Sequence, residues 1–144
     1  MSKQLIKDLR PYNKIANVSK DMTIRAMAER IVKHPEIHCL CVVDDSGKLL
    51  GLINRKRLFQ AIFSHHVSAS TKVTELYSLL TSESAEDLLI KHFLTCNESD
   101  QLDKIINMMI KNRLNAIPVL NEDEKLEGVV TIELLLSKWL EREK

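Results

Sequence analysis

Two stretches of the chain carry an apolar stripe at helical spacing, and each stripe is followed by two short apolar runs separated by a polar turn. Spacings of three and four residues place such a stripe on one face of a helix, and short apolar runs bounded by turn residues predict β-hairpins. The order helix, strand, turn, strand is therefore expected twice. The stripes are Ile24, Met27, Ala28 and Ile31 in the first stretch and Leu102, Ile105, Ile106 and Met109 in the second.

The two predicted hairpins align with each other without a gap. Residues 42–51 lie over residues 119–128, so that Gly51 falls on Gly128 at an offset of 77. The same offset continues into a predicted second helix in each copy, whose apolar positions are Leu58, Phe59, Ile62 and Phe63 in one and Leu135, Leu136, Trp139 and Leu140 in the other. The chain is therefore an internal tandem repeat.

Each copy is predicted to begin with a short lead-in strand, near Val18 and Cys96, before its first helix. Asp21 and Ser99 stand three residues before the stripes and are predicted N-caps, and Pro35 is expected to end the first helix. The repeats are placed at 1–66 and 84–144, with a linker containing a short helix at 67–83. Because a unit of about 60 residues is marginal alone, the prediction is an α+β fold in which two βαββα repeats pack sheet to sheet.

Composition narrows the function classes. Of 144 residues, 44% are apolar and 28% charged, and the net charge is +1, which offers no bulk attraction for nucleic acid. No apolar run approaches the roughly 20 residues that span a bilayer. The start of the chain lacks the pattern of a secretory signal, so a cytoplasmic protein without membrane insertion is expected.

Catalytic and metal-binding patterns are missing from the sequence. It contains no nucleophile elbow, Walker loop, zinc-protease motif or dinucleotide glycine pattern, and only three glycines. Cys39 and Cys41 lie in an apolar segment, are too close together for a usual zinc pair, and are expected to act as small hydrophobic residues. The sequence therefore predicts that the chain is not an enzyme.

The repeated segments resemble a known family, the tandem pair of cystathionine-β-synthase (CBS) domains called a Bateman module. The resemblance is carried by residues 115–120 and 128–135 in the second copy and by the more divergent residues 37–44 and 51–58 in the first. It implies binding of AMP, ADP, ATP or S-adenosylmethionine in the cleft between the repeats. It also implies a homodimer, a regulated partner protein that is not identified, and no required cofactor.

The resemblance also implies which residues contact a ligand. In the second copy they are Thr95, Asn115, Ala116, Ile117, Pro118 and Thr131, and in the first Asn17, His38, Cys39, Asn54 and Arg57. Nucleotide-binding members carry Gly-x-x-Ser/Thr-x-x-Asp, in which the hydroxyl favours a phosphate at a helix N-terminus and the aspartate accepts hydrogen bonds from ribose. The second copy keeps Thr131 but has Leu134 at the aspartate position; the first has Asn54 and Arg57.

Two functions remain open at this point. One is a sensor of an adenosine-containing ligand, bound near Thr131 and read by a partner protein. The alternative is a ligand-free dimerisation or scaffold module with degenerate nucleotide sites. The basic run 55–57 is interpreted either as a solvated surface or as an anion site formed by Arg57 with Asn54, and His38 either as a ligand contact or as a strand-edge residue.

Overall fold

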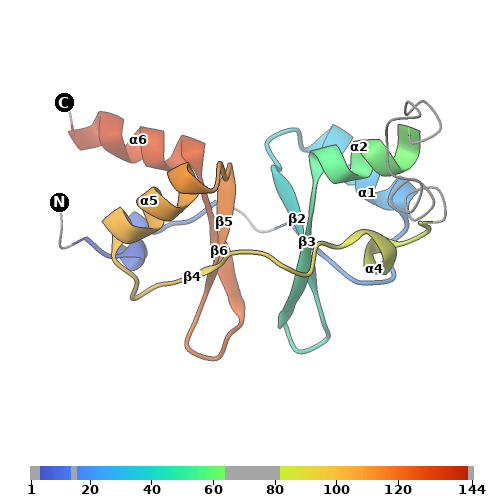
Figure 1. Ribbon diagram of the computed structural model, residues 1–144, viewed down its shortest axis with the longest axis horizontal. Coiled ribbons are helices and arrows are strands. Elements are labelled where there is room, and N and C mark those ends of the chain that lie inside the picture. The colour runs from blue at the N-terminus through green and yellow to red at the C-terminus, as the bar shows by residue number, and fades with distance from the viewer. Residues whose placement is uncertain (1–3, 14–15, 64–81, 143–144) are drawn as a thin grey trace. The chain divides into compact units, whose positions relative to one another are not determined.

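The computed structural model describes residues 4–13, 16–63 and 82–142, and its α+β architecture confirms the predicted fold class (Figure 1). Within these ranges there are two three-stranded sheets, each accompanied by helices. Contacts divide the chain into two compact units. The first unit consists of residues 1–15 and 94–144, and the second of residues 16–93.

The second unit contains one complete strand–helix–strand–strand–helix sequence. Its elements are β1 (Asn17–Val18), α1 (Ile24–Lys33), β2 (Cys39–Val43), β3 (Leu49–Asn54), α2 (Arg55–Phe63) and α4 (Ala85–Leu88). Strand β2 is central, parallel to β1 and antiparallel to β3. The core of this unit is built from Ala16, Val18, Met27, Leu40, Val42, Ile53, Leu58, Ala85 and Leu88.

The first unit repeats this arrangement. Its elements are η1 (Ile6–Leu9), β4 (Cys96–Asn97), α5 (Leu102–Lys111), β5 (Ala116–Leu120), β6 (Leu126–Thr131) and α6 (Ile132–Arg142). Strand β5 is central, and α5 and α6 lie on one face of the sheet (Figure 1). The core is built from Ile6, Leu9, Cys96, Leu102, Ile105, Met109, Ile117, Val119 and Val130.

The two hairpins are equivalent in register and in turn chemistry, as the repeat predicts. Val42 pairs with Gly51 and Val119 with Gly128, and each hairpin has its register shift at the next residue. The side chains of Asp44 and Asn121 each accept hydrogen bonds from two backbone N–H groups of their own turn. This local bonding stabilises the turns without help from distant residues.

The helix starts differ from the prediction. Thr23, not Asp21, caps α1, because its hydroxyl accepts the N–H of Ala26 at 3.1 Å. Helix α5 begins after Gln101, which makes no side-chain cap, so the predicted cap at Ser99 is wrong as well. In both cases the helix begins at the first residue of its apolar stripe, Ile24 in α1 and Leu102 in α5. The end of α1 at Lys33, shortly before Pro35, agrees with the prediction.

The lead-in segments are exchanged between the repeats. Residues 4–13 come before the first repeat's sheet, yet η1 buries Ile6 and Leu9 in the core of the first unit, beside the second repeat's sheet. Residues 85–88 likewise bury Ala85 and Leu88 beside the first repeat's sheet. The compact units thus divide the chain at other places than the predicted sequence repeats, 1–66 and 84–144. The limits of the repeats stay a prediction.

The predicted linker helix at 67–83 lies almost entirely outside the described residues. Among the described helices, none is long and apolar enough to cross a membrane. The cytoplasmic location stays a prediction.

Candidate functional site

In the first unit, the candidate site lies where β6 passes into α6. Thr131 is the last residue of β6 and is 5% exposed. Its hydroxyl oxygen accepts the backbone N–H of Leu134 at 3.1 Å and thereby caps the first turn of α6. The same hydroxyl donates to the side-chain oxygen of Asn13 at 2.7 Å. Thr131 is therefore the centre of a local hydrogen-bond network.

Asn13 belongs to the lead-in segment and was not among the predicted site residues. Its backbone N–H donates to the carbonyl of Val129 at 3.3 Å, which ties the segment to the edge of β6. The side chain of the neighbouring Tyr12 packs against Gly128 and occupies the space that a Cβ atom on the glycine would need. The predicted register of the hairpin marked Gly128, but nothing in the sequence indicated that residues 12–13 would approach it.

Hydrogen bonds to the carboxylate of Glu98 hold the same lead-in segment in place. The hydroxyl of Tyr12 donates to Glu98 at 2.7 Å, and the guanidinium of Arg10 also pairs with this carboxylate. The hydrogen bond from Tyr12, followed by that from Arg10, lowers the pKa of Glu98. Burial, followed by the hydrogen bond to Glu98, raises the pKa of Tyr12 to about 12. These hydrogen bonds hold Tyr12 in place beside Gly128.

The other predicted residues of this unit surround the Thr131 backbone. Ala116 is its pairing partner across the hairpin, and the carbonyl of Asn115 accepts the N–H of Ile132 at 3.1 Å. The Asn115 side chain is exposed, whereas Ile117 and Pro118 are fully buried. Asn115 and Ala116 therefore adjoin Thr131, while the side chain of Ile117 belongs to the core. Thr95 is half-buried just before β4.

The aspartate position of the family motif is occupied by a core residue in this unit. Leu134 is partly buried and packs against the apolar cluster. It cannot accept a hydrogen bond from a ribose hydroxyl. Leu134 instead joins helix α6 to the core.

In the second unit, the corresponding site lies where β3 passes into α2. The side-chain oxygen of Asn54 accepts the backbone N–H of Arg57 at 2.7 Å, so Asn54 caps α2 as Thr131 caps α6. The Arg57 side chain turns toward the lead-in segment and its Nε donates to the carbonyl of Leu88 at 2.9 Å. Arg57 thereby contacts the carboxyl end of α4, where a cation is favoured.

The remaining predicted residues of the second unit lie on or beside the same sheet. Cys39 pairs with Asn54, and the half-buried His38 precedes it, with its Nδ1 3.5 Å from the Arg55 guanidinium. Asn17 is exposed and pairs with Cys41 on the other side of β2. Arg55 also donates to the carbonyl of Pro35 at 3.2 Å, so part of the basic run is bonded to the protein.

All three cysteines are free thiols, and two of them interact. Cys39 is half-buried, whereas Cys41 and Cys96 are buried. A hydrogen bond between the Cys39 and Cys41 thiols lowers the pKa of Cys39 and raises that of Cys41. Burial raises the pKa of Cys96 to about 12. Within the described ranges, no group of three histidine, cysteine, aspartate or glutamate residues could hold a metal ion.

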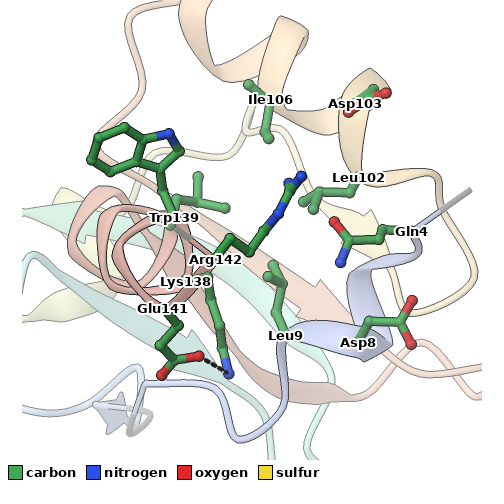
Figure 2. A pocket seen from close by; sticks show the side chains of 11 residues that line it. Gln4, Asp8, Leu9, Leu102, Asp103, Ile106, Lys138, Trp139, Glu141 and Arg142 are labelled. Atoms are coloured by element: carbon green, nitrogen blue, oxygen red, sulfur yellow. Dashed lines mark ion pairs between the residues drawn. The ribbon is translucent and has the colours of Figure 1, made fainter. Parts of the chain in front are cut away.

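A separate groove runs between η1, α5 and α6 (Figure 2). Its volume is about 330 Å³, and its apolar lining consists of Leu9, Leu102, Ile106, Leu135 and Trp139. Charged residues line its rim, among them Lys138 and Glu141, which form an ion pair at 3.9 Å. Thr131 is not among the residues that line this groove.

Helices α2 and α6 also expose apolar side chains, and Phe59, Ile62 and Phe63 of α2 fall on Leu136, Trp139 and Leu140 of α6 in the repeat. Of the apolar positions predicted in the first copy, only Leu58 is fully buried. The exposed residues are Phe59 (61%), Ile62 (38%) and Phe63 (44%) on α2, and Ile132 (39%), Leu136 (56%), Trp139 (56%) and Leu140 (56%) on α6. Exposed apolar patches on a folded chain mark surfaces of interaction.

Comparison with known proteins identifies the family. The CBS domain model matches residues 6–64 and 85–141, and the chain belongs to the CBS-domain family as a tandem pair. This confirms the resemblance found in the sequence.

Solved structures share the fold over nearly the whole chain. CBSX2 in complex with AMP has a TM-score of 0.80 at 19% identity, covering 97% of this chain and 98% of that one. The CBS domain pair of protein MJ0100, in complex with 5′-methylthioadenosine and S-adenosylmethionine, has a TM-score of 0.73 at 22% identity, covering 94% and 99%. A CBS domain-containing protein from Thermotoga maritima has a TM-score of 0.78 at 23% identity, covering both chains fully (100% and 100%).

Some curated relatives are longer proteins with enzyme names. A homoserine O-acetyltransferase from Methanosphaera stadtmanae is 25% identical over 131 residues, covering 91% of this chain and 23% of that protein. An L-aspartate semialdehyde sulfurtransferase from Methanocaldococcus jannaschii is 26% identical over 129 residues, covering 90% and 22%. The chain thus spans about a quarter of the length of these relatives.

Proposed function

We propose that this CBS pair is a regulatory module that senses an adenosine-containing ligand, AMP, ADP, ATP or S-adenosylmethionine, and signals its binding to a partner protein. The observation that carries the proposal is the buried Thr131 hydroxyl at the β6–α6 junction, which is bonded to the exposed Asn13, with the backbone carbonyl of the exposed Asn115 bonded to the next residue, Ile132. Related pairs of this fold are known in complex with AMP and with S-adenosylmethionine. A ligand can regulate only if it binds two states of the module with different affinity.

The proposal assigns no catalysis to the chain. Its enzyme-named relatives are about four times as long, and the segment they share with it is the CBS pair. Their reactions therefore give no reason to place catalysis here, and a regulatory role agrees with the absence of catalytic motifs in the sequence.

Isothermal titration with the four ligands, followed by titration of Thr131→Ala, tests the proposed site. Loss of the hydroxyl removes both the helix cap and the hydrogen bond to Asn13, so at least one ligand is expected to bind several-fold more weakly. Ser137→Ala is a matched control, because Ser137 carries an exposed hydroxyl on the same helix that donates to the Leu134 carbonyl at 2.8 Å. Equal affinity of wild type and Thr131→Ala would contradict this placement.

A second function is favoured by the residues that occupy the aspartate position of the family motif in the two repeats, because both have structural roles. Leu134 packs on one core, and Arg57 bonds the carbonyl of Leu88. A ligand-free dimerisation or scaffold module would need neither carboxylate. Failure of all four ligands to bind at millimolar concentration, by a protein that still dimerises, would support this alternative.

A further inference from the structure

Two thiols lie side by side on the central strand of the second unit. Cys39 and Cys41 are two positions apart on β2, so their side chains point to the same face of the sheet. The alternate residues Leu40 and Val42 point to the opposite face and belong to the apolar core. Cys39 is half-buried and Cys41 is buried, and a hydrogen bond joins their thiols. One thiol is therefore partly open to solvent, and the other lies beside it in the interior.

The fold does not require cysteine at these two positions. The repeat offset of 77 places Cys39 over Ala116 and Cys41 over Pro118. The strand pairing at these positions is the same in both hairpins. Alanine and proline thus satisfy the packing of the equivalent strand in the first unit, and packing alone does not account for the pair of thiols.

The two thiols differ in reactivity. The hydrogen bond from Cys41 lowers the pKa of the Cys39 thiol and so favours its thiolate, the form that attacks an oxidant. The same hydrogen bond, together with burial, raises the pKa of Cys41, which stays a thiol. Redox-sensing cysteines combine partial exposure and a lowered pKa with a second thiol beside them that can resolve the oxidised form. Cys39 and Cys41 meet these conditions.

We propose that Cys39 and Cys41 form a reversible redox pair, in which a hydroperoxide oxidises Cys39 and Cys41 converts the product to a disulfide within β2. The Cys39 thiolate attacks the hydroperoxide, a sulfur–oxygen bond forms as the oxygen–oxygen bond breaks, and the released alkoxide or hydroxide takes up the proton that Cys39 gave to solvent. The Cys41 sulfur then attacks this sulfenic acid, the sulfur–sulfur bond forms as the sulfur–oxygen bond breaks, and the hydroxyl leaves with the Cys41 proton as water. The two sulfurs lose two electrons, which the hydroperoxide gains. This input is separate from the proposed adenosyl ligand and does not depend on it.

The disulfide is expected to be strained and easily reduced. A rise of about 3.3 Å per residue puts the Cα atoms of Cys39 and Cys41 about 6.6 Å apart, near the upper limit of about 6.8 Å for a disulfide. Their Cβ atoms have to approach to about 3.8 Å, so β2 must bend between them. Strained disulfides have more oxidising potentials and are the labile, regulatory ones.

The bend acts on the neighbouring elements of the second unit. Cys39 pairs with Asn54, whose side chain caps α2 by accepting the N–H of Arg57 at 2.7 Å. The N–H of Cys41 donates to the carbonyl of Ala16 at 2.9 Å, next to β1. Oxidation is therefore expected to weaken the attachment of β1 and the start of α2, the helix that exposes apolar side chains to a partner.

Peptide mapping of the whole folded chain after treatment with hydrogen peroxide tests the pair. Trypsin releases Cys39 and Cys41 together in residues 34–48 and Cys96 separately in residues 92–104. The first peptide is expected to lose the mass of two hydrogens and its reaction with N-ethylmaleimide, and dithiothreitol should restore both. Cys96 should stay reduced. The oxidised chain should melt at a lower temperature than the reduced chain, because β2 is bent.

Three alanine variants assign the roles of the thiols. Cys41→Ala removes the resolving thiol, so oxidation of Cys39 should stop at the sulfenic acid, which dimedone traps. Cys39→Ala should leave residues 34–48 reduced under the same treatment. Cys96→Ala is the matched control and should form the disulfide as wild type does, because the buried Cys96 donates to the carbonyl of Pro118 at 3.6 Å and belongs to the first unit.

The wild-type result decides the proposal even if a variant fails to fold. A sulfenic or sulfinic acid on Cys39 with Cys41 still a free thiol, or a disulfide between two chains, would overturn the redox pair. Equal melting temperatures of the oxidised and reduced chains would overturn its effect on β1 and α2.

Discussion

Gly128 and Tyr12 lie so close that a Cβ atom on the glycine would be 2.6 Å from the Cβ of the tyrosine. The second unit has the same relationship at the repeated position, where a Cβ on Gly51 would lie 2.7 Å from Leu89 and 2.8 Å from the carbonyl oxygen of Ile90. In both units the glycine of the hairpin is the place where a lead-in segment from the other repeat reaches the sheet. The repeated glycine therefore serves the exchange of lead-ins.

Alanine at either glycine is expected to destabilise the chain by about 1–3 kcal/mol, the usual cost of overpacking. Gly51→Ala should cost more than Gly128→Ala, because it meets a backbone carbonyl that is bonded to Leu52 as well as a side chain. Urea unfolding measures both free energies, with Lys125→Ala, an exposed position of the same hairpin, as control. Free energies of unfolding equal to that of the control would show that the lead-ins can move aside.

Glu98 predicts a pH dependence of stability. Hydrogen bonds from Tyr12 and Arg10 lower the pKa of Glu98 in the folded chain. Glu98 therefore adds to the free energy of unfolding at pH values above its ordinary pKa of about 4.3, and this contribution is lost as the pH falls through its lower pKa in the folded chain. Tyr12 gives the opposite dependence. Its pKa is raised to about 12, so its contribution is present below about 10 and is lost as pH rises toward 12.

Glu98→Gln should therefore lower the free energy of unfolding at pH 7 and reduce its fall below about pH 4.3. Tyr12→Phe should abolish the part of the alkaline loss that Tyr12 causes. Urea unfolding across this pH range measures both, with Glu122→Gln, an exposed carboxylate in the neighbouring turn, as control. If the free energy of unfolding of Glu98→Gln varied with pH as that of the control does, the hydrogen bonds of Glu98 to Tyr12 and Arg10 would not stabilise the chain.

The sequence predicted those parts of the fold that depend on local pattern. Hairpin register and the four long helices follow from apolar spacing and turn residues, which act within a few positions of the chain. The exchange of lead-ins does not, because Tyr12 and Gly128 are 116 positions apart in the sequence and no local signal marks the contact. Asn13 was missed for the same reason. The motif comparison found Thr131, but it could not show that its hydroxyl already has two partners.

Arg57 is expected to stabilise the second unit through its hydrogen bond to the Leu88 carbonyl. Arg57→Ala should lower the free energy of unfolding by about 1 kcal/mol, the typical net contribution of one hydrogen bond. Lys56→Ala, a neighbouring exposed residue, should change it by less than about 0.5 kcal/mol. If Arg57 instead served only an anionic ligand, its removal would leave the unfolding of the free protein unchanged and alter ligand affinity alone.

Cys39 should be the most reactive of the three thiols. Its pKa is lowered by the hydrogen bond from Cys41, and the thiolate is the nucleophilic form, so it should react faster than the buried Cys41 and Cys96, whose pKa values are raised. Cys41→Ala removes the donor and should slow the reaction of Cys39, whereas Cys96→Ala should not. Timed alkylation followed by mass spectrometry of the peptides measures each rate. Faster modification of Cys96 than of Cys39 would contradict this order.

The exposed apolar residues of α2 and α6 predict a homodimer. Ile132, Leu136 and Leu140 recur every four residues and so form one stripe along α6, with half or more of Leu136 and Leu140 exposed (56% each). Covering such a stripe with a second copy of the chain would remove its apolar area from water. Light scattering after gel filtration should therefore give about twice the chain mass of 16.5 kDa.

A charge in the stripe tests which surface holds the dimer together. Leu136→Glu and Leu140→Glu should each shift the mass toward 16.5 kDa, because a carboxylate buried without a partner opposes association. Ser137→Glu adds the same charge to an exposed, polar position of α6 and should leave the dimer intact. Phe59→Glu applies the test to α2. A wild-type chain that already elutes at 16.5 kDa would refute the dimer, and the stripe would then need a different protein to cover it.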